Sequence, residues 1–378
     1  MIYYVAFYNP IQELGRRVAN YAGEDKIDYI CEKFECMDEP VTILSNTKSI
    51  KKKYLKRMVY IENKKKIVMF ASFPKCNVVL HALDVLYGYI QLAIYLWIHV
   101  KKDDVVLVYH SLGYRNVIQK IRKIKKFRYI LEVEELFQFV KSANSSFKLR
   151  EKTVFAEPDS FLFSNSFLNE KINIKNKPFI IINGIYKNQN LNLSVQTRRK
   201  KRVVYAGTLD QQKGVDYVIR AAQFLNENYE MKVIGFGSQQ DIERVRKLIE
   251  EINEHSKCDV FYDGVFKGQA YLDYLQGCDV GVCIQDPGDT FNLYEFPSKI
   301  LSYMSNGLNV VTNRLEQIEN SKIYPYLTIA DGITPEEVST AIIKACKKEK
   351  NAQEILKHLD QEFEVELKKM IKGEKQLC

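Results

Sequence analysis

The chain has 378 residues, 46% of them hydrophobic and 27% charged, and this composition excludes an intrinsically disordered protein. The length is sufficient for two domains of ordinary size. A net charge of +9 is compatible with anionic partners, but no RNA- or DNA-binding motif accompanies it, so nucleic acid is not an expected partner.

The first half alternates apolar, β-branched runs with helical stretches. Such continuous apolar runs predict strands of a parallel sheet that helices cover on both faces. No signal peptide precedes the first run, which favours a cytoplasmic protein. The expected strands are Tyr3–Phe7, Val41–Leu44, Ile67–Phe70, Val105–Tyr109, Tyr129–Val133, Phe161–Phe163 and Phe179–Ile182.

Two strongly basic runs lie within this half. Residues 48–66 contain nine Lys or Arg against one acid, Glu62, and residues 120–128 contain six and no acid. Either run can be an ordinary solvated face. The alternative is a basic surface for anionic lipid head groups or for a pyrophosphate-linked acceptor. Both interpretations stay open here.

The segment Val78–Val100 is long and apolar enough to be considered as a membrane span. Asp84 lies within it, and a carboxylate there would cost a few kcal/mol in lipid. We therefore expect a helix buried between the sheet and its neighbours. The protein is expected to lie on a membrane at most, and not to cross one.

The eight cysteines are scattered and form no zinc-binding spacing. Two close pairs, Cys31 with Cys36 and Cys278 with Cys283, lie in apolar surroundings, so we expect buried small hydrophobes. A reducing cytoplasm suits this usage.

A polar stretch after Asn183-Gly184 separates the two halves. The second half repeats the design, with expected strands at Val203–Ala206, Met231–Ile234, Val260–Tyr262, Val280–Ile284, Asn309–Thr312 and Leu327–Ala330. The predicted division is a first domain (1–185), a linker (186–202), a second domain (203–345) and a helical tail (346–378) that crosses back onto the first domain. Two doubly wound α/β domains imply ligand binding at the strand carboxyl ends.

Two stretches of the second half have the form of a nucleotide-phosphate site. Gly207 follows a strand directly, and Lys213-Gly214 opens the next helix, so a diphosphate could approach the backbone beside a positive charge. An ordinary αβ turn is the alternative. In the second stretch, Pro297 can start a helix, Asn306-Gly307 can end it, and a strand follows from Asn309.

Together these stretches resemble the donor-binding half of a family 4 glycosyltransferase, a retaining enzyme of GT-B architecture. The resemblance implies a donor site for a nucleotide sugar and no essential metal, because basic side chains neutralise the leaving diphosphate. No Asp-x-Asp triplet is present in the chain. The residues that the resemblance assigns to the donor are Gly207, Thr208, Lys213, Gly235, Gly237, Val265, Phe266, Asn292, Glu295, Pro297, Ser298, Lys299 and Ser302.

The chain departs from the family at its pair of acids. Ser302 stands where the family has the glutamate that binds the ribose hydroxyls, and Tyr294 stands at the earlier acidic position, with Glu295 beside it. A serine can make one of those hydrogen bonds, so donor binding is expected to be weaker by about 1–2 kcal/mol.

In the first domain, Gly15-Arg16 resembles the family's glycine turn beside the donor phosphate and acceptor, with Arg16 a candidate for an anionic group. His110 ends a strand on the expected cleft side, as a structural or a catalytic residue. Alternation points Glu132 and Glu134 to one side, and Glu134 is the catalytic candidate with His110 and Lys213.

The resulting prediction is a retaining transferase that moves a hexose from a nucleotide sugar, UDP-linked, to a polysaccharide or a lipid-linked oligosaccharide. The protein would be cytoplasmic, with a possible peripheral position on the inner membrane face. Two alternatives stay open: a catalytically inactive GT-B partner of another transferase, which Ser302 would permit, and a GT-B nucleotide-sugar epimerase.

Overall fold

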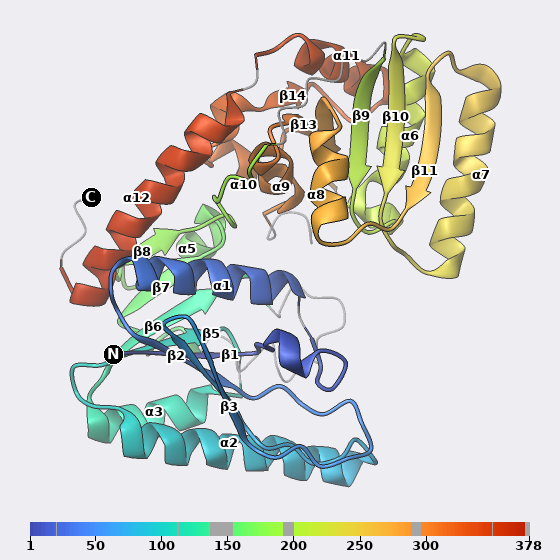
Figure 1. The fold of residues 1–378 in the computed structure, drawn as a ribbon. Helices are drawn as coiled ribbons and strands as arrows, with labels where there is room; N and C mark the ends of the chain where they lie inside the picture. The colour runs from blue at the N-terminus through green and yellow to red at the C-terminus, as the bar shows by residue number, and fades with distance from the viewer. Residues whose placement is uncertain are drawn as a thin grey trace. The chain divides into compact units, whose positions relative to one another are not determined.

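The computed structural model describes residues 1–19, 21–111, 113–136, 154–191, 200–288, 296–349 and 351–374 (Figure 1). The chain forms two compact units. Unit 1 comprises Met1–Ile182 and Phe363–Cys378, and unit 2 comprises Asn183–Glu362. Each unit contains one sheet.

The sheet of unit 1 has the strand order β3-β4-β2-β1-β5-β6-β7-β8. Strand β1 pairs with β2 on one side and with β5 on the other. The chain therefore builds the sheet outward in one direction from β1 and then in the other from β5, so the strand order reverses between β1 and β5. The strands are β1 (Ile2–Ala6), β2 (Val41–Ser45), β3 (Met58–Glu62), β4 (Lys65–Met69), β5 (Val105–Tyr109), β6 (Arg128–Val133), β7 (Ser160–Phe163) and β8 (Phe179–Ile181).

Strand β3 was not predicted, and it makes the sheet mixed instead of purely parallel. It pairs antiparallel with β4, from Met58 opposite Met69 to Glu62 opposite Lys65. Asn63 in the turn has a φ of 53°, which suits a two-residue hairpin. The strand lies inside the first basic run, and the lysines and the arginine on either side of its sequence, Met-Val-Tyr-Ile-Glu, hid it.

The helices of unit 1 cover both faces of the sheet. Figure 1 shows α1 on one face and α2 with α3 on the opposite face. The core on the second face joins Leu92 and Leu96 of α2, Ile118 of α3, and Val106 and Leu131 of the sheet. The described helices are η1 (Ile11–Glu13), α1 (Tyr21–Cys36), α2 (Val78–His99), α3 (Arg115–Lys125) and α5 (Ser166–Ile172).

The prediction that the helix of residues 78–100 is buried was wrong for one side of it. One face of α2 packs on the sheet, but the opposite face presents large apolar side chains to solvent. By length and composition alone α2 could cross a membrane. Asp84 is buried on the packed face, and its carboxylate accepts hydrogen bonds from Ser72 Oγ (2.9 Å) and the Phe73 amide (2.7 Å).

The sheet of unit 2 has the strand order β11-β10-β9-β12-β13-β14, and all its pairings are parallel. Read in chain order this is 3-2-1-4-5-6, so the order reverses between β9 and β12, which is where open α/β sheets bind ligands. The strands are β9 (Lys201–Ala206), β10 (Tyr229–Ile234), β11 (Asp259–Gly264), β12 (Val280–Cys283), β13 (Asn309–Asn313) and β14 (Thr328–Ala330).

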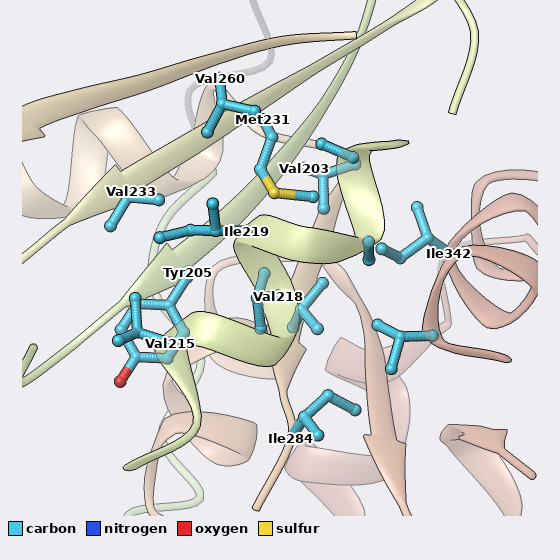
Figure 2. Packing of buried hydrophobic residues seen from close by; sticks show 14 of the residues in the cluster. Val203, Tyr205, Val215, Val218, Ile219, Met231, Val233, Val260, Ile284 and Ile342 are labelled. Carbon is cyan, nitrogen blue, oxygen red and sulfur yellow. The ribbon is translucent and has the colours of Figure 1, made fainter. Parts of the chain in front are cut away.

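Helix α6 is central to the core of unit 2. Figure 2 shows Val215, Val218 and Ile219 of this helix packed among Met231 and Val233 of the sheet. Their i, i+3, i+4 spacing is the one predicted for a packed helix. The described helices are η2 (Gln211–Lys213), α6 (Val215–Ala221), η3 (Ala222–Phe224), α7 (Gln239–His255), α8 (Gln269–Gln276), α9 (Lys299–Ser305), α10 (Glu316–Glu319), η5 (Tyr324–Tyr326), α11 (Pro335–Cys346) and α12 (Ala352–Lys372).

The last helix, α12, starts in unit 2 and ends in unit 1. Within unit 1, Phe363 stacks on Tyr29 with ring centroids 5.7 Å apart, and Arg128 donates hydrogen bonds to the Met370 and Ile371 carbonyls. Of the cysteines that were expected to be buried, Cys31, Cys278 and Cys283 are buried, whereas Cys36 is exposed.

Candidate functional site

The carboxyl ends of β9, β10 and β11 are joined by main-chain hydrogen bonds that continue past the strands. The Gly207 amide donates to the Ile234 carbonyl (3.0 Å), and the Gly235 amide donates to the Gly264 carbonyl (2.8 Å). The Leu209 amide also donates to the Phe236 carbonyl (2.9 Å). The loops after these three strands therefore form one continuous surface of main chain beside the β9–β12 switch point.

Two glycines are required for this packing. A Cβ on Gly235, whose φ is 141°, would lie 1.7 Å from the Gly207 carbonyl oxygen. A Cβ on Gly214, whose φ is 80°, would lie 1.8 Å from the carbonyl oxygen of Ile284, at the end of β12. Because no side chain fits at either place, the loops can approach each other closely.

Lys299 brings a positive charge to the Gly207 turn. Its ammonium group donates a hydrogen bond of 2.7 Å to the Tyr205 hydroxyl and lies 4.0 Å from the centre of that ring. A Cβ on Gly207 would lie 2.3 Å from Lys299 Cε, so the glycine leaves room for the lysine to pass. The sequence predicted Lys299 as a donor-site residue, but it did not predict that Lys299 contacts the Tyr205 hydroxyl and ring.

The Tyr205 hydroxyl connects this lysine to the predicted phosphate loop. It donates to the Thr208 carbonyl (2.6 Å) and lies 3.2 Å from the Lys213 carbonyl. Lys213 itself ends η2, and Gly214 follows in the left-handed conformation as the N-cap of α6. The expected order of glycine, lysine and helix is therefore present, although Lys213 sits in a 3-10 turn before the helix.

The stretch after residue 296 has the local structure that the sequence predicted. The Ile300 amide donates to the Pro297 carbonyl (3.0 Å), and Ser298 is the N-cap of α9. Gly307 ends the helix with a φ of 78°, and β13 starts at Asn309. Asn292, Tyr294 and Glu295 lie outside the described residues.

Ser302, which stands where the resembled family has its ribose-binding acid, contacts a tyrosine. Its Oγ lies 3.2 Å from the Tyr271 hydroxyl of α8, and either oxygen can be the donor. The Tyr303 hydroxyl of the same helix accepts a hydrogen bond from the Ala206 amide (2.8 Å). Helix α9 is thus fixed to the end of β9, and Ser302 is oriented by Tyr271.

The predicted nucleobase loop lies at the end of β11. Gly264 has a φ of 83°, Val265 after it is exposed, and the Phe266 ring contacts Tyr274 of α8 with centroids 4.5 Å apart. In the neighbouring turn, a Cβ on Gly237 would lie 2.9 Å from Asp241 Cβ, so this glycine admits the start of α7.

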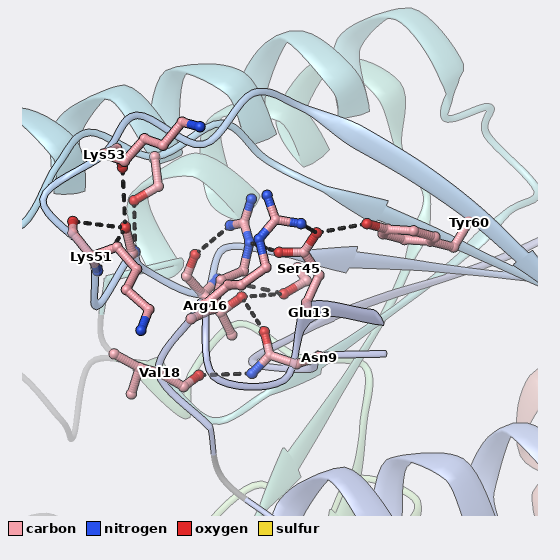
Figure 3. A network of polar contacts seen from close by, with 12 residues as sticks. Asn9, Glu13, Arg16, Val18, Ser45, Lys51, Lys53 and Tyr60 are labelled. Atoms are coloured by element: carbon pink, nitrogen blue, oxygen red, sulfur yellow. Dashed lines mark hydrogen bonds and ion pairs between the residues drawn. The ribbon is translucent and has the colours of Figure 1, made fainter. Parts of the chain in front are cut away.

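In unit 1, the loop after β1 is built around a buried ion pair (Figure 3). Arg17 Nε lies 3.1 Å from Glu13 Oε2, and Arg17 Nη1 donates to the Thr47 carbonyl (2.7 Å). Glu13 Oε1 also accepts from the Tyr60 hydroxyl (2.6 Å). Both members of the pair are buried, whereas Arg16, the predicted anion-binding residue, is half exposed and lies 3.0 Å from Glu13.

Arg17 was not singled out by the sequence, because nothing in the sequence marks which of two adjacent arginines is buried. The result is a division of roles between neighbours. Arg17 and Glu13 hold the loop in place. Arg16 follows Gly15, which has a left-handed backbone conformation (φ 69°), and its guanidinium group is half exposed to solvent.

His110 is buried at the end of β5. Its Nδ1 donates to the Glu135 carbonyl (3.2 Å), and its ring lies 5.3 Å from that of Phe155. Burial lowers the pKa of His110 to about 4, against a smaller opposing effect of the Glu135 carbonyl. Near neutral pH the imidazole is therefore uncharged and can share hydrogen bonds but not act as a general acid.

The two acids at the end of β6, Glu132 and Glu134, contact each other, and each also contacts a partner of its own. Glu132 is buried and accepts a hydrogen bond from the Tyr4 hydroxyl. Glu134 pairs with Lys26 Nζ at 2.5 Å, and the same ammonium donates to the Ile182 carbonyl (3.2 Å). Burial first, and then the Glu134 charge, raise the pKa of Glu132 to about 8.

Within the described part of the chain, no group of three or more His, Cys, Asp or Glu side chains is placed to hold a metal ion. The absence of an essential metal stays a prediction.

Comparison with known proteins gives one sequence match and many structural ones. Residues 200–348 match a family model described as "Glycosyl transferases group 1". No curated protein matches the chain by sequence. Family 4 membership stays a prediction, because the match covers less than half of the chain.

The structural matches extend over the whole chain at low identity. A trehalose-6-phosphate synthase structure, OtsA, matches with a TM-score of 0.68 and 11% identity, over 97% of this chain and 98% of that one. A trehalose-6-phosphate structure from E. coli with bound UDP-2-fluoro glucose matches with a TM-score of 0.62 and 12% identity, over 98% of this chain and 96% of that one. A UDP-forming trehalose-phosphate synthase from Burkholderia xenovorans matches with a TM-score of 0.63 and 9% identity, over 97% of this chain and 95% of that one. The predicted fold, two parallel-sheet α/β domains of GT-B type, is confirmed.

Proposed function

We propose that this protein is a retaining glycosyltransferase that moves a hexose from a UDP-linked sugar to a glycan or to a lipid-linked oligosaccharide. The observation that carries the proposal is at the strand carboxyl ends of unit 2, beside β9 and β12. There, close-packed glycine turns, the main-chain carbonyl of Lys213 and the ammonium group of Lys299 meet at Tyr205. This edge lies within residues 200–348, the segment that matches glycosyl transferases.

The chemistry of this edge suits a leaving nucleoside diphosphate. As the bond between the sugar C1 and the phosphate oxygen breaks, negative charge grows on the diphosphate, and nearby lysine ammonium groups and main-chain amides stabilise it. The acceptor oxygen forms the new bond to C1, and its proton passes to the leaving phosphate. This front-face route retains the configuration at C1 and needs no covalent nucleophile, so none is assigned.

The structural relatives supply the first donor and acceptors to test. One was solved with UDP-2-fluoro glucose, another with glucose 6-phosphate, and a third concerns glycosyl transfer with retention. Nothing in these comparisons favours the inactive GT-B partner or the nucleotide-sugar epimerase. The neutral, buried His110 is proposed to orient a substrate by hydrogen bonding, and Glu134 and Arg16 to face the acceptor side.

The test is a donor screen that measures release of UDP or GDP from a panel of nucleotide sugars. Each donor is assayed with a lipid-diphosphate sugar, with glucose 6-phosphate and without acceptor. Acceptor-dependent UDP release with a retained product linkage is the expected result. A folded protein that binds the donor but releases nothing with any acceptor would favour the inactive partner, and interconversion of the donor sugars would favour the epimerase.

A further inference from the structure

The exposed face of α2 carries a continuous apolar ridge. We define the ridge as Val79, Leu83, Leu86, Ile90, Ile94 and Trp97, all of them exposed. These residues follow one another at steps of three or four, so they share one side of the helix. Val79 is 68% exposed, and Ile90 and Trp97 are each 47% exposed.

The ridge carries no charged side chain, because the acid of α2 points the other way. Asp84 is buried among Ser72, the Phe73 amide and Lys48, whose ammonium lies 3.6 Å from the carboxylate. Gln91 likewise bonds to the Ala71 main chain. With one side built into the protein core, α2 cannot act as a membrane span. It instead presents an exposed apolar strip about 27 Å long, since Val79 and Trp97 are 18 residues apart and each residue adds about 1.5 Å.

Basic side chains flank the N-terminal end of the ridge. The Lys75 amide donates to the Lys51 carbonyl (3.0 Å), which places the segment of Lys51, Lys52 and Lys53 beside the start of α2. These three lysines and Lys56 are exposed, and no ion pair is found for them among the described residues. They differ in this from Lys64 and Lys65 of the same basic run, which form ion pairs with Asp38 and Asp28.

The other end of the ridge is also basic. The Lys125 ammonium of α3 lies 5.3 Å from the centre of the Trp97 ring. Lys101, Lys102 and Lys123 are exposed nearby in the chain, beside one exposed acid, Asp103. Figure 1 shows α2 and α3 along the same face of the sheet. Ile124 of α3 is also exposed.

We infer that this face of unit 1 docks on an anionic lipid bilayer, with the ridge of α2 inserted at the level of the head groups. An apolar strip together with basic flanks is the combination that stable attachment requires, since either signal alone binds weakly. Tryptophan and lysine are also the side chains that anchor at the membrane–water interface. A second copy of this chain is a poorer occupant, because pairing two ridges would bring lysine clusters against each other.

The single tryptophan of the chain lies on the ridge, so its fluorescence reports on the inference directly. The full-length protein is titrated with vesicles of phosphatidylglycerol and phosphatidylcholine, and with vesicles of phosphatidylcholine alone. We expect a blue shift of Trp97 emission and protection from an aqueous quencher with the anionic vesicles. Binding to the neutral vesicles should be weaker by about ten-fold or more, since several lysines contribute.

Two sets of variants separate insertion from simple charge attraction. Leu86→Asp with Ile90→Asp should abolish binding at every salt concentration, whereas Ile174→Asp with Phe224→Asp, exposed apolar residues on other elements, should not change it. Charge reversal of Lys51, Lys52 and Lys53 to Glu should weaken binding at low salt, and the same reversal of Lys247, Lys257 and Lys357 should not.

Several outcomes would overturn the inference. One is an unchanged Trp97 spectrum with anionic vesicles, and another is equal binding to both vesicle types. A third is a dimer in solution that Leu86→Asp dissociates, because the ridge would then be an interface between copies of the chain.

Discussion

The strand carboxyl ends of the two units are built in different ways. In unit 2 they consist of glycine turns joined by main-chain hydrogen bonds, and the Lys299 ammonium group donates a hydrogen bond to the Tyr205 hydroxyl. In unit 1 they are made of buried polar side chains: the ion pair of Glu13 with Arg17 and the hydrogen bond from the Tyr4 hydroxyl to Glu132. In unit 2 the glycines let the loops pack closely beside a lysine, and in unit 1 the polar side chains hold the loops in place. This difference is why we propose the diphosphate site in unit 2, and expect unit 1 to offer a ligand only its few exposed polar groups.

The largest effect is expected from the buried pair of unit 1. Arg17→Met would leave the Glu13 carboxylate buried without its main cation, so the free energy of unfolding should fall by about 3–5 kcal/mol. Arg16→Met, the adjacent and half-exposed arginine, should cost less than about 1 kcal/mol. Urea denaturation of both variants measures the difference. Equal costs would show that the two arginines do not divide their roles as the structure indicates.

The next effect tests the glycine packing of unit 2. Gly235→Ala should destabilise the protein by about 3 kcal/mol, because the new Cβ meets the Gly207 carbonyl and the loops must separate. Gly264→Ala is the matched control, since its φ is also positive but no atom lies within 4 Å of the new Cβ. Thermal unfolding distinguishes them. A control as damaging as Gly235→Ala would assign the effect to backbone strain alone.

The third effect concerns pH. Glu132 has its pKa raised to about 8 in the folded chain from 4.5, so its contribution to stability is present below 4.5 and is lost as pH rises through about 8. Glu132→Gln should therefore raise the free energy of unfolding by about 2–4 kcal/mol at pH 9 and change it little at pH 5.

His110 provides a comparison of opposite sign. Its pKa is lowered to about 4 from 6.5, so its contribution to stability is present above 6.5 and is lost as pH falls through about 4. His110→Gln should therefore raise the free energy of unfolding only at acidic pH, as the pH falls from 6.5 toward about 4. An effect of Glu132→Gln that does not depend on pH would contradict the buried, protonated carboxyl group.

The smallest effect tests the ribose position. Ser302→Glu should retain UDP binding or tighten it by about 1–2 kcal/mol, because a carboxylate at this point of α9 can accept from Tyr271 and from a ribose hydroxyl. Calorimetry with UDP measures it. A folded variant that no longer binds UDP would show that the donor lies elsewhere.

These regions also differ in how far the sequence predicts them. The Gly207 turn, Lys213 and the Pro297–Gly307 helix could be read from consecutive residues, because main-chain geometry leaves a local pattern. The contacts of Lys26 with Glu134 and of Tyr4 with Glu132 join residues more than 100 positions apart, and no local pattern marks them.

Two other misses have their own physical reasons. Strand β3 was hidden because its five residues lie between lysine-rich stretches, so that the whole of residues 48–66 had the composition of a solvated surface. The exposed face of α2 was missed because an all-apolar helix has the same composition whether neighbours or a membrane cover it, and only the buried Asp84 fixes which side faces inward.

The central claim is that unit 2 holds a nucleoside diphosphate sugar through its lysines, and calorimetric titration with UDP-glucose tests it most directly. Lys213→Ala and Lys299→Met should each weaken the affinity by about 1–3 kcal/mol, the value of a charged hydrogen bond. Lys247→Met, on exposed α7, should leave it unchanged. Unchanged affinity in both site variants, or an equal loss in the control, would contradict the account.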